Sequence, residues 1–218
     1  MTCAAHCCAI EAQFGRRIAQ RDLANYRRSG PSPSTQQLLS ATRQAGIAGA
    51  TVLDIGGGIG VIAHELLASE AAHGTIVDAS AAYLAAAHQE SERRHSSEHL
   101  TLLNGDFLGI AQDVPVADVV TLDKVVCCYP DMAGLLAASV GRTRRLLGIV
   151  YPRDSWWMRF AIVMQNWLRA LRGSAFRVYV FPNAAIDNAI RRAGLAPRSQ
   201  RRGFVWVVAL YERLSGAQ

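Results

Sequence analysis

Residues 51–60 read Thr-Val-Leu-Asp-Ile-Gly-Gly-Gly-Ile-Gly, and this stretch decides the fold. An apolar strand ends beside an acid, and a glycine-rich loop leads directly into a helical stretch, Val61–Ala68. Glycine is needed there because it permits a tight turn with positive φ and lets a ligand approach the backbone closely. The first N–H groups of the following helix point back at that loop. The stretch therefore predicts a ligand-binding loop between a strand and a helix.

Further short strands also end in acids. Residues 74–78 form an apolar run that ends in Asp78, 22 residues after Gly56, which is the spacing at which an acid meets ribose hydroxyls in a doubly wound sheet. Residues 100–107 end in Gly-Asp-Phe, and residues 117–124 contain a strand that ends in Asp123. The carboxyl ends of these strands are expected to meet at one edge of a sheet.

This order of acid-terminated strands resembles class I S-adenosylmethionine-dependent methyltransferases, over residues 40–218. The resemblance implies S-adenosyl-L-methionine as cofactor and S-adenosyl-L-homocysteine as product. In that family the glycine loop passes under the methionine part, an acid after the second strand binds ribose, and an acid with an apolar neighbour after the third holds adenine. A nicotinamide enzyme carries Gly-x-Gly-x-x-Gly, whereas Val61 occupies the last position here. The implied cofactor-binding residues are Asp54, Gly56, Gly57, Gly58, Asp78, Ala79, Asp106, Phe107 and Asp123.

Alternating strands and helices over residues 51–150 predict a mainly parallel sheet. We expect an α/β fold: a doubly wound, Rossmann-like seven-stranded sheet, mostly parallel with an antiparallel last strand, plus an N-terminal helical lid. The expected divisions are a cysteine-bearing helical segment, 1–35, and a methyltransferase domain, 36–218, with a helical insertion, 155–172. Other expected elements are helices at 10–28, 36–45 (capped by Ser34 or Thr35), 81–95 and 183–193, and closing strands at 197–202 and 204–212.

The helix expected at 155–172 has one wide apolar face. Packing on the sheet is one interpretation of this face. Others are a lid over a large flat apolar substrate, or a peripheral contact with a membrane surface. Trp156 and Trp157 are expected nearest the carboxyl edge and are candidate substrate-binding residues. The face consists of Trp156, Trp157, Phe160, Val163, Met164, Trp167, Leu168 and Leu171.

The residues after the fourth strand are expected to border the transferred methyl group. Lys124, the only lysine, is either an anion contact or incidental, and Tyr129 either orients or deprotonates a nucleophile or completes the core; these two are the candidate catalytic residues. Tyr26 and Cys128 are candidate substrate-binding residues, although Tyr26 could equally lie on a surface helix. The segment lacks the Asn/Asp-Pro-Pro-Tyr signature of methyltransferases that act on bases or glutamine.

The five cysteines form no zinc-ligand pattern, and no metal is expected. Cys127 and Cys128 point to opposite sides if their segment is extended, and the histidines, His64 among them, are expected to be solvated. The odd number of cysteines favours a reducing cytoplasm. The remaining cysteines are Cys3, Cys7 and Cys8.

The net charge of +6 comes from scattered Arg-Arg pairs, so a nucleic-acid partner is not expected. No uncharged apolar run is long enough for a transmembrane helix, and the oligomeric state stays open. We expect an enzyme that methylates a small molecule, at a carboxylate or hydroxyl oxygen. The layout also resembles the magnesium-protoporphyrin IX methyltransferase group, which acts on a propionate, although Cys128-Tyr129 replaces that group's histidine-tyrosine pair. The alternatives are a thiol or metalloid methyltransferase, and a cofactor-binding protein without turnover.

Overall fold

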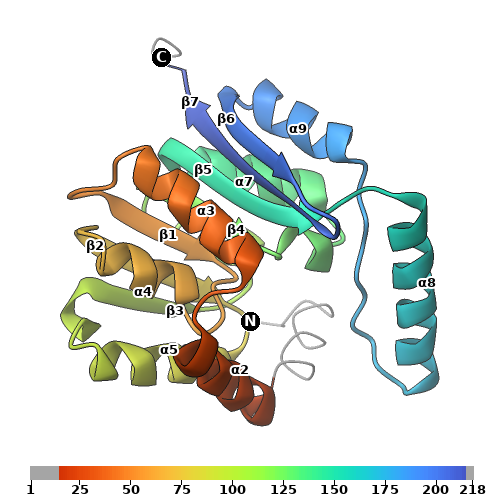
Figure 1. Ribbon diagram of the computed structural model, residues 1–218, viewed down its shortest axis with the longest axis horizontal. Coiled ribbons are helices and arrows are strands. Elements are labelled where there is room, and N and C mark those ends of the chain that lie inside the picture. The colour runs from red at the N-terminus through yellow and green to blue at the C-terminus, as the bar shows by residue number, and fades with distance from the viewer. Residues whose placement is uncertain (1–14, 215–218) are drawn as a thin grey trace.

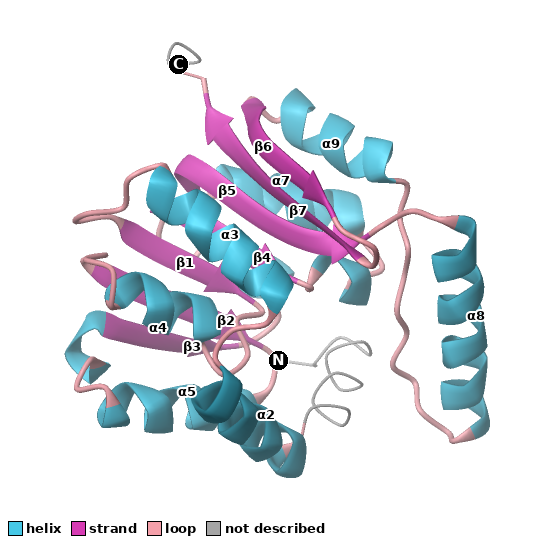
Figure 2. Ribbon diagram, viewed as in Figure 1, coloured by secondary structure: helices cyan, strands magenta, loops and turns pink. Residues whose placement is uncertain are grey.

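The computed structural model describes residues 15–214. A twisted sheet lies at its centre, with helices on both faces (Figure 1, Figure 2). The seven strands lie in the order β3-β2-β1-β4-β5-β7-β6. Their bounds are β1 Thr51–Ile55, β2 His73–Asp78, β3 Leu100–Asn104, β4 Ala117–Asp123, β5 Thr143–Pro152, β6 Leu195–Arg202 and β7 Trp206–Arg213. The helices are α2 Arg16–Ser29, α3 Pro33–Gln44, α4 Val61–Leu67, α5 Ala81–Arg93, α6 Phe107–Ile110, α7 Met132–Gly141, α8 Trp156–Leu171 and α9 Asn183–Arg192, with 3₁₀ turns η1 Ser97–His99 and η2 Val126–Cys128.

The sheet has the predicted direction of its strands. β1 pairs in parallel with β2 and β4, and the parallel pairing continues outward to β3 and β5. β7 runs antiparallel between β5 and β6. The chain order reverses between β1 and β4, and such a switch point opens a crevice at the carboxyl ends of the strands. The expected doubly wound, seven-stranded sheet with an antiparallel last strand is confirmed.

Two apolar layers hold the helices against the sheet. Leu38 and Leu39 of α3 and Ile62 of α4 pack on Val52 and Val119 on one face. On the other face, α6, α7 and α9 cover the alternate strand residues. The buried residues contributed to that second layer by these helices are Phe107, Leu135, Leu136, Val140, Ile186 and Ile190.

The start of α3 differs from the prediction. Ser32, not Ser34 or Thr35, is the N-cap, and its hydroxyl accepts from the backbone N–H of Thr35. Pro33 occupies the first helical position, where its lack of an N–H costs nothing. The helix therefore begins earlier than the expected position 36, and the predicted division between residues 35 and 36 falls within α3.

α8 leaves the body of the protein after β5 and projects from it at the right of Figure 1. Met158 is its only buried residue, so the interpretation of this helix as packed on the sheet is wrong. A clamp closes the base of the excursion: the Asp154 N–H donates to Oδ1 of Asn183 at 3.0 Å, and Nδ2 of Asn183 donates to the Pro152 carbonyl at 3.1 Å. The helix is thus displaced outward, while the start and the end of the excursion, residues 152–154 and Asn183, stay together.

Candidate functional site

A cavity of about 600 Å³ opens at the carboxyl ends of the strands, which is within the usual range for small-molecule sites. Its walls come from the loops after β1 to β4 and from the N-terminal helices α2 and α3. The lining residues are Asp22, Asn25, Tyr26, Ser29, Gly30, Pro31, Ser32, Thr35, Gly56, Gly57, Gly58, Ile59, Val61, Val77, Asp78, Ala79, Tyr83, Gly105, Phe107, Asp123, Lys124, Val125, Cys128 and Tyr129.

The glycine loop forms the floor and tolerates no side chain. Gly56 has φ +61°, and a Cβ there would lie 2.6 Å from Cγ2 of Val125. A Cβ on Gly57 would lie 2.6 Å from Oδ2 of Asp54. The loop therefore presents bare backbone to the cavity, as a cofactor that lies against it requires.

Asp54 supports this loop from below. Its side chain is buried, is not part of the cavity lining, and accepts a 2.7 Å hydrogen bond from the Thr121 hydroxyl. Burial raises the pKa of Asp54 to about 7. We conclude that Asp54 acts on the shape of the loop and does not face the cavity.

Asp78 lies at the carboxyl end of β2 and lines the cavity. Its Oδ2 accepts from the Gly58 N–H at 2.9 Å and its Oδ1 from the Ser80 N–H at 2.8 Å. These bonds fix the carboxylate, and its remaining lone pairs are available to donors in the cavity. Burial raises the pKa of Asp78 above its ordinary value, while the two N–H groups oppose that shift.

Asp106 and Phe107 follow β3, as predicted. Phe107 lines the cavity, whereas Asp106 does not, and Oδ1 of Asp106 accepts a 2.6 Å hydrogen bond from the Tyr129 hydroxyl. Tyr129 is buried and also borders the cavity. The sequence analysis did not predict this contact between Tyr129, a candidate catalytic residue, and Asp106, a candidate adenine-binding residue.

Asp123 and Lys124 join the end of β4 to the start of α3. The Thr35 hydroxyl donates to Oδ2 of Asp123 at 2.6 Å, and Nζ of Lys124 donates to the hydroxyls of Ser32 and Thr35 at 3.0 and 3.1 Å. Nζ also lies 3.2 Å from Oδ1 of Asp123. Lys124 is therefore engaged in holding the N-terminal segment over the cavity.

α2 forms one wall of the cavity and includes residues that the sequence analysis missed. Asp22 accepts a 2.6 Å hydrogen bond from the hydroxyl of Tyr83 in α5, and both side chains line the cavity. No motif marks them, because the two residues meet only when α2 lies across α5. Tyr26, which was predicted, also lines the wall.

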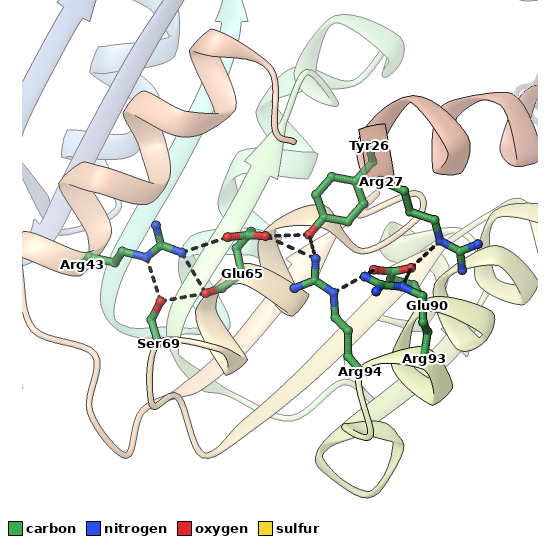
Figure 3. Close-up of polar contacts among 8 residues, drawn as sticks. All are labelled: Tyr26, Arg27, Arg43, Glu65, Ser69, Glu90, Arg93 and Arg94. Carbon is green, nitrogen blue, oxygen red and sulfur yellow. Dashed lines mark hydrogen bonds and ion pairs between the residues drawn. The ribbon is translucent and has the colours of Figure 1, made fainter. Parts of the chain in front are cut away.

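A polar network fastens α2 to the body, as Figure 3 shows. The Tyr26 hydroxyl donates to Oε1 of Glu65 in α4 at 2.7 Å and accepts from Arg94 at 2.6 Å. Arg43 of α3 also pairs with Glu65. Tyr26 thus lines the cavity and also ties α2 to Glu65 and Arg94 through its hydroxyl.

The same network includes Glu90, whose side chain has no exposed surface. Arg27 from α2 donates to it at 2.8 Å, and Arg93 and Arg94 also bind it. These three arginines outweigh burial and hold the pKa of Glu90 well below its usual range. The carboxylate is therefore charged and ties α2 to α5.

Cys127 and Cys128 lie in the 3₁₀ turn η2, and the expectation based on an extended segment is wrong. The turn brings both thiols to one side, with 3.9 Å between the two Sγ atoms. Cys128 lines the cavity. No cluster of three potential metal ligands exists within residues 15–214. Cys3, Cys7 and Cys8 lie outside the described residues.

His64 is buried, contrary to the expectation that the histidines are solvated. It lies on the inner side of α4, and burial lowers its pKa to about 4, with the charge of Arg94 acting in the same direction.

Trp156 and Trp157 are not among the residues that line the cavity. Trp156 is exposed, and Trp157 stacks on Phe204 at 4.6 Å between ring centroids. The physical reason is the outward course of α8 (Figure 1), the helix that contains both residues. A residue that the sequence analysis did not single out, Arg169, lies on the inner side of the same helix, over the ring of Phe176.

The family model of the methyltransferase domain matches residues 52–144, which include the glycine loop, Asp78 and the ends of β3 and β4. Residues 52–144 therefore form a methyltransferase domain, and the chain has the fold of class I S-adenosylmethionine-dependent methyltransferases. The matched residues of this methyltransferase contain the floor of the cavity, whereas α2, α3 and α8 lie outside the match. No curated protein sequence matches the chain.

Solved structures share the fold of this methyltransferase at low sequence identity. Magnesium protoporphyrin IX methyltransferase from Synechocystis PCC 6803, with bound SAH, has a TM-score of 0.74 at 16% identity, over 96% of this chain and 100% of that chain. An O-methyltransferase family protein from Burkholderia thailandensis has a TM-score of 0.71 at 18% identity, over 92% and 61%. A putative sarcosine dimethylglycine methyltransferase from Galdieria sulphuraria has a TM-score of 0.67 at 12% identity, over 83% and 85%.

The helices of residues 15–214 are all too short or too polar to cross a bilayer.

Proposed function

We propose that this methyltransferase methylates a carboxylate oxygen of a small, largely apolar acid. S-adenosylmethionine supplies a methyl group already activated on a sulfonium. The chain's own residues must therefore bind and align the reactants and exclude water, and such positioning can supply on the order of 7–11 kcal/mol. Roles follow for the residues at the cavity: Asp78 accepts from the ribose hydroxyls, the Gly56–Gly58 backbone and Ala79 border the cofactor, and Phe107 packs on adenine.

Arg169 carries the proposal of an acid as acceptor. Its Nη1 is buried and has no hydrogen-bond partner among the described residues. The contact with Cys127 lowers the pKa of the Cys128 thiol against the effect of burial, and the charge of Arg169 acts in the same direction as that contact. A buried, unpaired guanidinium N–H is costly. A carboxylate is its best-matched partner because it can accept two parallel N–H bonds.

The carboxylates of the cavity support the same acceptor. Asp22 already accepts from Tyr83, and Asp123 already accepts from Thr35. Asp78 holds two backbone N–H groups. Among the described lining residues, every carboxylate thus has a structural bond, which suits a nucleophile that is anionic before it binds and needs no general base.

A labelled-methyl assay tests this function. The chain, labelled S-adenosylmethionine and a panel of apolar carboxylic acids, alcohols and amines are incubated, and the products are treated with mild alkali. A methyl ester releases labelled methanol under alkali, whereas an ether or a methylamine does not. Protoporphyrin IX is a suitable member of the panel because the similar Synechocystis enzyme is named for a protoporphyrin. An alkali-stable product, or SAH binding without any product, would contradict the proposal.

Arg169→Gln and Arg172→Gln form a matched pair for the acceptor site. Arg172 lies on the same helix but is exposed. Loss of a charged hydrogen bond of about 1.5–3 kcal/mol should raise the acceptor KM roughly ten- to a hundredfold in the Arg169 variant. The KM for S-adenosylmethionine should be unchanged in both variants, and the Arg172 variant should behave as the parent.

A thiol or metalloid acceptor is the second candidate. The observation in its favour is the pair of Sγ atoms 3.9 Å apart, one of them at the cavity wall. Cys128→Ser separates the two functions. It should leave methylation of a carboxylate within about threefold, since the serine hydroxyl keeps the wall nearly the same shape, and it should abolish methylation of arsenite or a thiol.

A cytoplasmic location remains a proposal that rests on the odd number of cysteines.

A further inference from the structure

The outer face of α8 and the tip of the β6–β7 hairpin form one exposed apolar surface, here named the α8 surface. Trp156 is 82% exposed and Phe204 at the hairpin tip is 74% exposed. Trp157 stacks on Phe204 and so joins the helix to the hairpin. More than half of each remaining side chain on this surface is exposed: Phe160, Val163, Trp167 and Leu171. Contiguous apolar surfaces of this kind mark interaction sites.

The polar face of α8 fixes which way the apolar face points. Asn166 exchanges two hydrogen bonds with the backbone of Val178, at 2.7 and 3.0 Å, and Arg169 lies over Phe176. These contacts bind the polar side to the returning chain, residues 174–181. The Tyr179 N–H in turn donates to the Cys127 carbonyl at 2.7 Å. The apolar side therefore faces away from the body, with no described residue over it.

Unpaired cations predominate around the α8 surface, where Asp154, just before the helix, already pairs with Arg159. Residues 155–186 contain no acid. Arg153 and Arg172 are exposed near the two ends of the helix, and Arg201 and Arg202 are exposed beside the hairpin tip. None of these four arginines belongs to an ion pair between described residues. Unpaired cations at the rim of an apolar surface complement an anionic partner.

We propose that the α8 surface docks on the surface of a bilayer that contains anionic phospholipids. α8 would lie in the plane of the interface, with its aromatic residues at the depth of the headgroups and the arginines against the phosphates. With 16 residues, α8 is too short to span the hydrocarbon core. Tryptophans with unpaired arginines fit this interface better than a second copy of the chain, because two such copies would bring like charges together.

This inference goes beyond the proposed acceptor and does not depend on it. The outer side of α8 meets lipid, while Arg169 on its inner side lies over Phe176 of the returning chain. An apolar acid dissolved in the membrane would then reach the enzyme along one helix.

Vesicle flotation with the full chain tests the docking. Vesicles of phosphatidylcholine with about one third phosphatidylglycerol are compared with pure phosphatidylcholine, because arginines favour the anionic surface. The chain should partition at least tenfold more strongly onto the anionic vesicles, and the partition should fall with added salt. Tryptophan emission should shift to shorter wavelength on binding.

Phe160→Glu with Val163→Glu should reduce partition at least tenfold, because two charges would enter the interface. Val116→Glu is the matched control. Val116 is an exposed apolar residue just before the amino end of β4, whereas α8 follows the carboxyl end of β5, and the Val116 variant should float like the parent. Thermal stabilisation by SAH, measured without vesicles, shows that each variant is folded.

A variant that loses SAH stabilisation is replaced by Arg172→Glu with Arg201→Glu, which keeps the apolar surface and should abolish the preference for anionic vesicles. The proposal is overturned if the parent chain ignores anionic vesicles, or if folded glutamate variants float as well as the parent. It is also overturned if light scattering shows a parent dimer that those substitutions convert to monomers, since a second copy would then cover the surface.

Discussion

The hydroxyl of Tyr129 donates a 2.6 Å hydrogen bond to Oδ1 of Asp106. This bond joins the wall that follows β4 to the loop that follows β3, across the end of the cavity. A tyrosine whose hydroxyl is held by a carboxylate is suited to positioning that loop. It is not arranged to take a proton from an acceptor.

Tyr129→Phe should therefore change catalysis only modestly. We expect a kcat within about tenfold of the parent, because a lost general base would cost roughly 10²–10⁴-fold. SAH affinity should fall several-fold, as the Asp106 loop loses one hydrogen bond. Steady-state kinetics and titration calorimetry measure the two effects, and a kcat loss beyond a hundredfold with normal SAH affinity would restore Tyr129 as the base.

Asp78→Ala should weaken SAH binding at least tenfold, because two ribose hydroxyls lose a charged acceptor worth about 1.5–3 kcal/mol for each bond. The variant also frees the N–H groups of Gly58 and Ser80, so circular dichroism must show that it is folded. Asp113→Ala, at an exposed acid outside the cavity, is the control. Parental affinity in the Asp78 variant would exclude the ribose role.

Tyr26→Phe should weaken the attachment of α2 to the body while keeping an aromatic ring at position 26. The hydroxyl bonds to Glu65 and Arg94 are lost, so we expect about 1 kcal/mol less stability and a three- to tenfold weaker SAH complex. Arg28→Ala provides the comparison, because Arg28 bonds to Asn25 within the same helix. Urea denaturation measures the stability of each variant, and SAH titration measures its affinity for SAH. An SAH affinity as low in Arg28→Ala as in Tyr26→Phe would show that the network of Figure 3 has no special role in closing the cavity.

Lys124→Ala and Lys124→Gly distinguish the contacts of the lysine from its backbone strain. Lys124 has φ +65°, a conformation that costs a side-chain-bearing residue about 1–2 kcal/mol. Both variants lose the bonds to Ser32 and Thr35, but only glycine relieves the strain. Urea denaturation should find the glycine variant about 1 kcal/mol more stable than the alanine variant. An alanine variant of equal or higher stability would mean that the local backbone relaxes.

His64 should make the fold sensitive to acid. Its pKa is about 4 in the folded chain against 6.5 for the free side chain, so the unfolded chain binds the extra proton between these values. Stability should then fall as pH drops from 6.5 to 4, by about 3 kcal/mol in all. His64→Gln should lack this component, and the difference between variant and parent removes contributions from other groups such as Asp54. A difference that stays constant from pH 7 to pH 4 would refute the burial effect.

The strands could be predicted because local sequence determines them. β1, β2 and β4 are short apolar runs that end at acids, and a parallel sheet brings such ends together. The glycine loop could also be predicted from the sequence, since Gly56 occupies a position where a Cβ would collide with Val125. Neither inference needed knowledge of which helix lies where.

The rest depended on contacts between distant residues. Tyr83 meets Asp22 only because α2 crosses α5, and no local pattern encodes that crossing. α3 begins at Pro33, earlier in the chain than predicted. Cys127 and Cys128 lie in a 3₁₀ turn, so the prediction that their side chains point to opposite sides, made for an extended segment, is wrong. The periodicity of α8 gave its bounds to within a residue at each end, but amphipathicity alone does not say what covers an apolar face.

Asn183 has a consequence for how this protein can change. Its side chain bonds to both Pro152 and Asp154. Asn183 therefore holds together the two ends of the segment that contains α8. Residues 155–182 also contact the body through the stacking of Trp157 on Phe204 and the bond from the Tyr179 N–H to the Cys127 carbonyl. The outer face of α8 lies between these anchors and can consequently change while the sheet and the cavity keep their shape. Selection can thus alter the outer face of this helix without rebuilding the cavity.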